Sequence, residues 1–305
     1  MNYLSVVDKF FPDQPSGSAR VAYDIACLMR DRGYAVTVFC RRQKPKDPDC
    51  SHCKGMQVVR FDYPQTVSLD PFKLQKQIAL GTIAAKKYLL NTKWDIVHLH
   101  LAPHGSMVMN ALGPDQNYVY TAHSPMVDEQ LANWAIRGFA GKIKSLLGTG
   151  TLQKVEKKVL LQVKRIQTLS HFTKNILAQR YKLDDKITVI PHWCRPDFTR
   201  LHDKVQAREK LGWSAEMRVL FTVRRLAPRM GLDIAIQAVA PLLKQYPDMV
   251  FIIAGDGFLR QSLQQQAAAL DTSGKIRFLG RVSDDVLKLC YEAADPSISF
   301  VSDIH

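Results

Sequence analysis

Short runs of β-branched and aromatic residues recur along this chain, and they alternate with stretches whose apolar residues recur at helical spacing. Residues 3–7 and 36–40 are two such runs, and Val21, Ile25 and Leu28 mark a helix between them. Two strands joined by a helix are parallel, and a parallel sheet needs helices on both faces. The alternation therefore predicts an α/β protein built on parallel sheets.

The alternation falls into two series. The first has strand-like runs at 57–61, 96–99, 118–121, 166–169 and 187–190, with helical stretches near 72–90, 105–112 and 173–181. Residues 191–200 contain two prolines and are typical of a linker. The second has strands at 218–223, 250–254, 276–279 and 297–301, with helices at 231–245, 258–270 and 283–294. We therefore expect two domains, residues 1–195 and 196–305, with ligands bound at the carboxyl ends of their strands.

The composition and net charge limit the classes of protein to which this chain can belong. With 46% hydrophobic residues among 305, the chain is predicted to be globular and not disordered. Its net charge of +14 favours an anionic partner, which would be nucleic acid, an acidic membrane surface or an anionic small molecule. No uncharged apolar run is long enough to span a bilayer, and Asp8 precedes any signal-peptide core. A cytoplasmic protein is therefore expected.

Cys50 and Cys53 have the C-x-x-C spacing of zinc and redox sites. A structural zinc site needs four ligands, and no second pair of cysteines or histidines lies nearby in the sequence. We therefore predict an ordinary surface loop there and no bound metal. The remaining cysteines lie in apolar segments, where a free thiol behaves as a small hydrophobe; they are Cys27, Cys40, Cys194 and Cys290.

The loop after the first strand, residues 11–18, ends where a helix begins. Ser16 and Gly17 place backbone N–H groups there that suit a phosphate or a sugar hydroxyl, and Ser18 is the expected N-cap. The loop lacks the G-x-G-x-x-G spacing of a dinucleotide site. A plain strand-to-helix turn is the alternative.

Three arginines lie between the strand that ends near 223 and the helix that begins near 231: Arg224, Arg225 and Arg229. A planar guanidinium matches phosphate oxygens, and the positive end of the helix dipole adds to the same place. We predict that these arginines bind a diphosphate without a metal ion. Solvated surface arginines are the alternative, which the apolar strand and helix on either side disfavour.

Glycine turns end the next two strands. Gly255 and Gly257 follow one of them, and Gly280, two residues before Val282, follows the other. Glycine allows the backbone to approach a ligand closely. Each turn alone is a weak signal, but the arginine cluster and both turns, in this order, are specific.

Together these features resemble the large family 4 of retaining glycosyltransferases, which have the GT-B fold. The matching motifs in the second half are Arg-Leu-x-Pro-x-x-Gly at 225–231, Ala-Gly-Asp-Gly at 254–257, Phe-Leu-Gly at 278–280 and Ala-Ala-Asp at 293–295. The first half matches at Ser-Gly 16–17, Asp-Ile-Val-His 95–98, Thr-Ala-His 121–123 and Ile-Pro-His 190–192. The resemblance covers nearly the whole chain and implies two Rossmann-like domains that face a cleft.

The resemblance also implies what each domain binds. The second domain would hold a nucleoside-diphosphate-sugar, with Arg225 at the diphosphate and the backbone of 280–282 along the nucleobase. The first would hold the acceptor, with His123 near the anomeric centre as the candidate catalytic residue, orienting or stabilising the leaving diphosphate. No cofactor is expected besides this donor substrate. Core packing is expected for three other histidines, His98, His100 and His104.

Two departures from the family pattern are visible. Met230 stands where the family usually has lysine, and Arg229 would supply that charge. The Glu-x7-Glu motif that grips the donor sugar does not follow 293–295 before His305. A carboxy-terminally truncated chain with an incomplete second domain is therefore expected. The hypotheses are a retaining, metal-independent transfer of sugar to a glycan, lipid-linked or small acceptor, or an inactive sugar-nucleotide-binding remnant or subunit.

Residues 137–165 form a basic segment, with eight lysines and arginines against Glu156. Apolar residues interleave with them at roughly helical spacing. Such a surface suits docking on anionic lipid, which would hold the protein on the inner face of the membrane. A solvated face over a buried apolar stripe is the alternative. Nucleic-acid binding ranks last, because no recognised fold for it is present.

Overall fold

The computed structural model describes the chain except residues 15, 65–69, 136–137, 194–200, 271–273 and 297–305. Within 132–148, and at Arg229, only the backbone is described. The strand expected at 297–301 and Cys194 therefore lie outside the described residues. The chain divides into two compact units, Met1–His192 and Trp193–His305. Both are α/β units with parallel strands, which confirms the predicted fold class.

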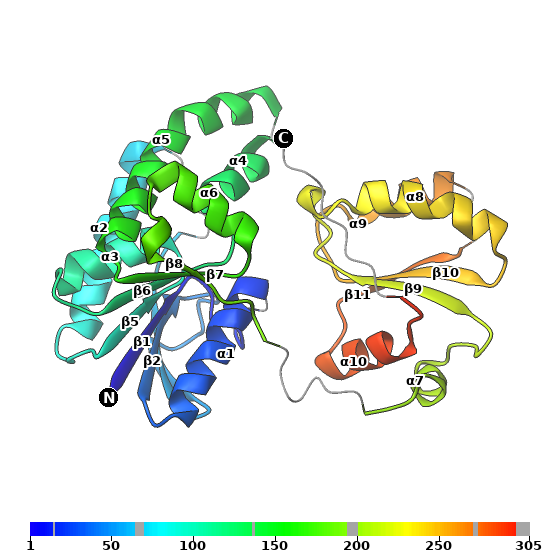
Figure 1. Cartoon of the computed structure of the whole chain (residues 1–305), viewed down its shortest axis with the longest axis horizontal. Helices are drawn as coiled ribbons and strands as arrows, with labels where there is room; N and C mark the ends of the chain where they lie inside the picture. The colour runs from blue at the N-terminus through cyan, green and yellow to red at the C-terminus, as the bar shows by residue number, and fades with distance from the viewer. Residues whose placement is uncertain (15, 65–69, 136–137, 194–200, 271–273, 297–305) are drawn as a thin grey trace. The chain divides into compact units, whose positions relative to one another are not determined.

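An eight-stranded sheet forms the centre of the first unit (Figure 1). In pairing order its strands are β3 (Cys50–Cys53), β4 (Met56–Phe61), β2 (Ala35–Arg41), β1 (Asn2–Val7), β5 (Ile96–Leu99), β6 (Tyr118–Ala122), β7 (Arg165–Thr168) and β8 (Ile187–Val189). All of these pairs are parallel except β3 with β4. The strand order reverses between β1 and β5, and ligands bind beside such a reversal.

Helices cover both faces of this sheet, as a parallel sheet requires. α1 (Gly17–Asp31) packs on one face, through Val21, Ala22 and Ile25. The other face carries α2 (Pro71–Leu89), α3 (Ala102–Leu112), α5 (Gly138–Gln162) and α6 (His171–Tyr181), with α4 (Met126–Ala135) packed on α5 (Figure 1). α3 begins earlier than the expected 105, because Pro103 fits its first turn, where a missing N–H is harmless.

The surface loop predicted at the C-x-x-C motif is wrong, because Cys50–Cys53 is a strand that pairs antiparallel with β4. Lys54 and Gly55 have φ of 47° and 76°, and they form the two-residue connection between the strands. A type I′ hairpin turn needs positive φ at both positions. Side chains three apart on a strand point to opposite faces, so Cys50 and Cys53 are poorly placed to share one ion. No group of three or more His, Cys, Asp or Glu side chains that could hold a metal occurs in the described part of the chain.

The second unit holds a three-stranded parallel sheet in the order β11 (Ile276–Gly280), β10 (Met249–Ala254), β9 (Arg218–Val223). α8 (Leu232–Gln245) and α9 (Arg260–Ala269) cover one face, where their apolar residues pack on Phe251 and Ile253. α7 (Lys204–Leu211) and α10 (Asp284–Ala293) cover the other face (Figure 1). Each strand-to-helix connection follows the carboxyl end of its strand, and these connections carry the predicted donor motifs.

The Ala-Ala-Asp motif holds the second unit together. Asp295 accepts a hydrogen bond from the Val219 N–H at 2.7 Å, just inside β9. It also pairs with the Arg208 guanidinium of α7 at 2.8 Å, and Arg208 is 5% exposed. The carboxylate therefore joins α7, the end of α10 and strand β9, and its role here is structural.

Candidate functional site

The arginine loop between β9 and α8, Arg224 to Gly231, is fixed by backbone hydrogen bonds to the next strand-end loop. The Arg224 N–H donates to the Ala254 carbonyl at 3.0 Å, and the Leu226 N–H donates to the Asp256 carbonyl at 3.1 Å. The Gly255 N–H donates to the Gly280 carbonyl at 2.7 Å. The loops after β9, β10 and β11 therefore form one connected surface at the carboxyl ends of the strands.

Two glycines make this close approach possible. A β-carbon at Gly255 would lie 1.9 Å from the Arg224 carbonyl oxygen, and one at Gly257 would lie 2.2 Å from that of Leu226. Gly255 also has φ of 122°, which side chains rarely tolerate. The glycines of this motif are thus needed to pack one loop backbone against the other, a role distinct from approach to a ligand.

Positive charge is concentrated on this surface. Arg225 is exposed, and no residue that the structure describes forms an ion pair with its guanidinium. Arg224 is half-buried, and the side chain of Arg229 lies outside the described residues. Arg260, the first residue of α9, places its guanidinium 3.2 Å from where a β-carbon at Gly280 would lie. Sequence reasoning missed Arg260, although its place after Gly255 and Gly257 at a helix start was a signal.

Val282 and Gly280 belong to the third of these loops. The half-buried Val282 side chain packs in the core beneath β9 and β10. Gly280 has φ of 73°, and its carbonyl already accepts from Gly255. A nucleobase lying along residues 280–282 would therefore contact backbone atoms.

The first unit presents a separate loop, residues 8–16 between β1 and α1. Ser16 is the N-cap of α1, and its hydroxyl accepts from the Ala19 N–H at 3.3 Å. The prediction of Ser18 as N-cap is wrong, because Ser16 has the extended backbone that a cap needs, while Ser18 is already helical. Gly17 has nothing within 4 Å of a β-carbon added to it. Gly17 and Ser18, at the start of α1, are exposed.

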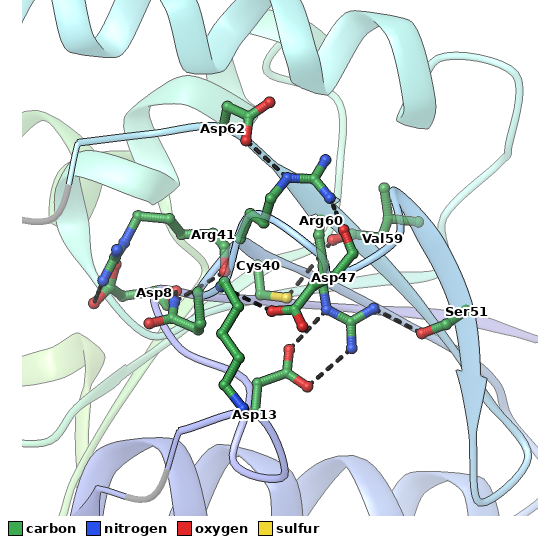
Figure 2. Close-up of polar contacts among 12 residues, drawn as sticks. Asp8, Asp13, Cys40, Arg41, Asp47, Ser51, Val59, Arg60 and Asp62 are labelled. Atoms are coloured by element: carbon green, nitrogen blue, oxygen red, sulfur yellow. Dashed lines mark hydrogen bonds and ion pairs between the residues drawn. The ribbon is translucent and has the colours of Figure 1, made fainter.

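A buried ion pair holds this loop in place, as Figure 2 shows. The Arg60 guanidinium of β4 donates to both oxygens of Asp13, at 2.7 and 3.0 Å, and to the Ser51 hydroxyl at 2.7 Å. Arg60 is 5% exposed. A bidentate pair of this kind fixes orientation as well as distance. Arg60 thus positions the chain just before Ser16, a contact that sequence reasoning missed.

A second pair anchors the start of the same loop. Arg41, at the end of β2, donates to Asp8 at 2.8 Å (Figure 2), and the His104 ring lies 3.6 Å from that carboxylate. Burial alone would raise the pKa of Asp8, but His104 and Arg41 together lower it below its ordinary value. Burial lowers the pKa of His104. Asp8 therefore stays ionised under a loop that begins at the switch point of the sheet.

The core beneath this edge contains a chain of polar side chains. The Tyr3 hydroxyl contacts His98 Nδ1 at 2.6 Å, and His98 Nε2 contacts the Thr121 hydroxyl at 2.7 Å. Thr121 in turn donates to Gln167 at 3.0 Å. Burial lowers the pKa of His98 to about 3, so the ring is neutral. His98 lies in the core, as the sequence predicted, and its contacts link neighbouring strands of the sheet.

His123 lies just beyond β6, in contact with His100. The two rings stack with centroids 5.3 Å apart, and His100 Nδ1 is 3.1 Å from His123 Nε2. Burial, with a smaller contribution from His192, lowers the pKa of His123 to about 4. Its buried Nδ1 has no hydrogen-bond partner among the described residues. His123 is thus a neutral imidazole, held on one nitrogen and without a described partner on the other.

The basic segment 137–165 is described only in part. Its side chains up to 148 lie outside the described residues. In the part that is described, the lysines are exposed and Leu152, Val159 and Leu160 are buried in the core. Across the described residues, no helix combines the length and apolar character needed to cross a bilayer.

Comparison with known proteins gives matches over both units. The family model "Glycosyltransferase Family 4" matches residues 15–198, and "Glycosyl transferases group 1" matches residues 203–299. An alpha-monoglucosyldiacylglycerol synthase from Streptococcus pneumoniae is 23% identical over 96% of this chain and 64% of its own length. A phosphatidyl-myo-inositol mannosyltransferase from Mycobacterium leprae is 24% identical over 93% of this chain and 68% of its own. The chain thus spans about two thirds of the length of these relatives.

Solved structures with the GT-B fold resemble this one. Sucrose-phosphate synthase from Thermosynechococcus elongatus aligns with a TM-score of 0.76 at 17% identity, over 97% of this chain and 75% of its own. WaaG, a glycosyltransferase involved in lipopolysaccharide biosynthesis, aligns with a TM-score of 0.72 at 18% identity, over 98% and 75%. HepE from Anabaena, solved with UDP and glucose, aligns at 0.68 and 18%, over 99% and 74%. Since the first family model covers more than half of its residues, the chain belongs to glycosyltransferase family 4 and has the GT-B fold.

Proposed function

We propose that the protein transfers a sugar from a nucleoside-diphosphate-sugar to a lipid-linked or glycan acceptor. The observation that carries this is the connected surface of three strand-end loops in the second unit, with Arg224, Arg225 and Arg260 beside it. In open α/β sheets such a surface is where ligands bind. Its charge favours an anion with two phosphates over a neutral sugar.

The donor is proposed to bind with its diphosphate at Arg225 and its nucleobase along the backbone of 280–282. Arg225 has no ion-pair partner in the described part of the chain, so its guanidinium is available to phosphate oxygens. Gly255 and Gly257 hold the arginine loop in position for this contact. The solved relative with UDP and glucose supports a uridine nucleotide as the first ligand to test.

Isothermal titration with UDP tests this binding. Arg225→Ala should weaken UDP binding roughly tenfold to a hundredfold, because it removes a charge-assisted hydrogen bond. Arg218→Ala is the matched control, since Arg218 lies at the opposite end of β9 and pairs with Asp248 at 2.6 Å. Equal losses in the two variants, or none in either, would count against this site. GDP and ADP measured in parallel define the base preference.

His123 is proposed as the catalytic residue of the acceptor side. A neutral imidazole can accept from an acceptor hydroxyl or donate to a departing phosphate oxygen. His123→Asn should lower kcat by roughly a hundredfold or more and leave UDP binding unchanged. Unaltered kcat would remove His123 from the mechanism. Donor binding without transfer in the wild-type protein would favour the binding-only alternative.

Retention at the anomeric carbon and independence of metal are further parts of the proposal. NMR of the first product, recorded before mutarotation, identifies the anomer, and an inverted product would contradict retention. Transfer should persist in excess EDTA, because arginines can neutralise the diphosphate charge. Loss of activity in EDTA that Mg²⁺ restores would contradict the metal-free mechanism.

Peripheral association with a membrane is also proposed. The names of two relatives contain a lipid, diacylglycerol in one and phosphatidyl-myo-inositol in the other, and such lipids lie in bilayers. The net charge of +14 suits an anionic lipid surface. The sequence points to residues 137–165 for this contact, and the described lysines of that segment are exposed.

A further inference from the structure

Helix α2 packs on the sheet and on α3 through one face only. Leu74, Ala85 and Leu89 of that face are buried. At Gly81 the two helices come so close that a β-carbon would lie 2.1 Å from the Met107 sulfur. This contact fixes the rotation of α2 about its axis, and therefore which of its side chains face outward.

The outward face of α2 carries large apolar side chains. Phe72 is 83% exposed, Ile83 65%, Leu90 54% and Leu80 49%. At about 100° per residue, all four fall within about 80° of one another around the helix. Single exposed apolar residues are ordinary on a soluble protein, but an aligned stripe that extends along about 27 Å of helix indicates a contact surface.

Lysines share this stripe. Lys76, Lys86 and Lys87 are exposed and lie within about 60° of Ile83 around the helix. The helix contains no Asp or Glu. The Asp49 carboxylate, outside the helix, accepts a hydrogen bond from Tyr88 at 2.7 Å and lies near Lys87. A stripe of apolar side chains among cations, with no anion from the helix itself, complements a bilayer surface with anionic head groups. The apolar residues enter the acyl boundary, while the lysine ammonium groups reach the phosphates.

Helix α5 offers a contrast within the same unit. In its described part Leu152, Val159 and Leu160 are buried in the core, and Leu161 is exposed at 48%. The described lysines of this helix, Lys154, Lys157 and Lys158, therefore share the solvated face with a single large exposed apolar side chain. Charge alone gives weak, salt-sensitive attraction, whereas α2 combines charge with surface that can insert.

We propose that α2 is the docking surface for an anionic lipid bilayer, with the helix lying in the plane of the interface and Phe72, Leu80, Ile83 and Leu90 inserted. This extends the proposed lipid acceptor and rests on it only in part, because docking can be measured without donor or transfer. It assigns the membrane contact to α2 and not to the described lysines of α5.

Cosedimentation with sucrose-loaded vesicles tests the proposal. The wild-type protein should bind equimolar phosphatidylglycerol and phosphatidylcholine vesicles, and bind phosphatidylcholine vesicles far less. The triple variant Lys76→Gln/Lys86→Gln/Lys87→Gln should lose roughly a hundredfold in affinity, at about fivefold per lysine. Phe72→Ser/Ile83→Ser, which keeps the charge, should lose roughly tenfold or more.

The matched control is Lys154→Gln/Lys157→Gln/Lys158→Gln on α5, which removes the same charge from exposed positions. It should lose far less affinity than the α2 triple variant. Equal losses would overturn the proposal in favour of a diffuse basic surface, and a larger loss in the control would assign docking to α5.

Two further measurements separate lost docking from lost folding and from self-association. Circular dichroism melts and UDP titration of each variant show whether the fold and the donor site are intact, since all of these positions are exposed. Sedimentation velocity detects a second copy of the chain as the occupant. A dimer that Phe72→Ser/Ile83→Ser dissociates, with vesicle binding unchanged, would overturn the membrane assignment. Failure of UDP binding with intact vesicle binding would refute the donor site and leave this inference standing.

Discussion

Replacing Gly255 by alanine should destabilise the second unit and leave the stability of the first unit unchanged. The new β-carbon would lie 1.9 Å from the Arg224 carbonyl oxygen and 2.9 Å from its carbonyl carbon. Both are backbone atoms, so no side chain can rotate away. The arginine loop must move, yet its Arg224 N–H is bonded to Ala254 at 3.0 Å and the Gly255 N–H to Gly280 at 2.7 Å.

The cost has three parts. Forcing a side chain into φ of 122° costs about 1–2 kcal/mol. Overpacking against fixed atoms costs about 1–3 kcal/mol. Losing one backbone hydrogen bond costs about 1 kcal/mol. Together they come to about 3–6 kcal/mol, a large share of the roughly 5–15 kcal/mol that stabilises a typical domain.

Hydrogen exchange measures this in the intact chain. Because two units need not unfold together, a single melting curve would mix them, whereas exchange is followed peptide by peptide. Protection of β9, β10 and β11 should fall by roughly a hundredfold to ten-thousandfold. Peptides of β1 and β2 should be unchanged, since they belong to the first unit.

Gly212→Ala is the control for backbone strain alone. Gly212 has φ of 67° at the end of α7, and nothing lies within 4 Å of a β-carbon built there. That variant should lose only about 1–2 kcal/mol, roughly a fivefold to thirtyfold fall in protection. If Gly255→Ala lost no more than Gly212→Ala, the close approach of the two loops would not be a determinant of stability, and the reasoning would be refuted.

Three further predictions concern titration and the ion pairs. Burial raises the pKa of Glu156 from 4.5 to about 7. Ionising this carboxyl group should therefore lower the free energy of unfolding by about 3 kcal/mol. This loss of stability should be absent below pH 4.5 and complete above pH 7. Urea unfolding at about pH 5 and pH 8 should therefore show Glu156→Gln gaining stability relative to wild type as pH rises, and a constant difference would contradict this. The pKa of His123 is lowered to about 4, so kcat should show no His123 titration between about pH 5 and 8; an inflection near 6.5 that His123→Asn abolishes would contradict it. Asp295→Ala should cost about 2–4 kcal/mol because it strands the buried Arg208, whereas Asp248→Ala, at an exposed pair, should cost at most about 1 kcal/mol in the same urea titrations. Equal costs for the two would remove Asp295 from its structural role.

The alternation of strands and helices could be predicted because its signals are local. A buried parallel strand is a short apolar run and a covering helix has a period of about 3.6, so neither depends on distant partners. β3 was missed for the opposite reason. Its sequence Cys-Ser-His-Cys has no apolar alternation, and it is a strand only because the turn at Lys54 and Gly55 folds it back on β4.

Some features of the candidate site could also be predicted from local sequence, whereas others could not. The glycines and arginines of the second unit stand in loops that directly follow strands, so the order of motifs along the chain gives their neighbours. Other contacts join residues that are distant in sequence. His100 and His123 are 23 positions apart, and the ion pair of Arg60 with Asp13 joins residues 47 positions apart. They follow from which strands are adjacent, and the sheet order is a tertiary result that periodicity does not contain.

Helices α2 and α5 show where a pattern becomes ambiguous. Both segments carry apolar residues at helical spacing with several lysines, and the sequence favours 137–165 because it has the larger number of charges. What decides a docking surface is which apolar residues remain outside once one face has packed. On α2 the close contact of Gly81 with Met107 turns Phe72 and Ile83 outward, while the described leucines of α5 turn mostly inward. Charge count therefore measures how strongly a face attracts a membrane, and packing determines whether that face has anything to insert.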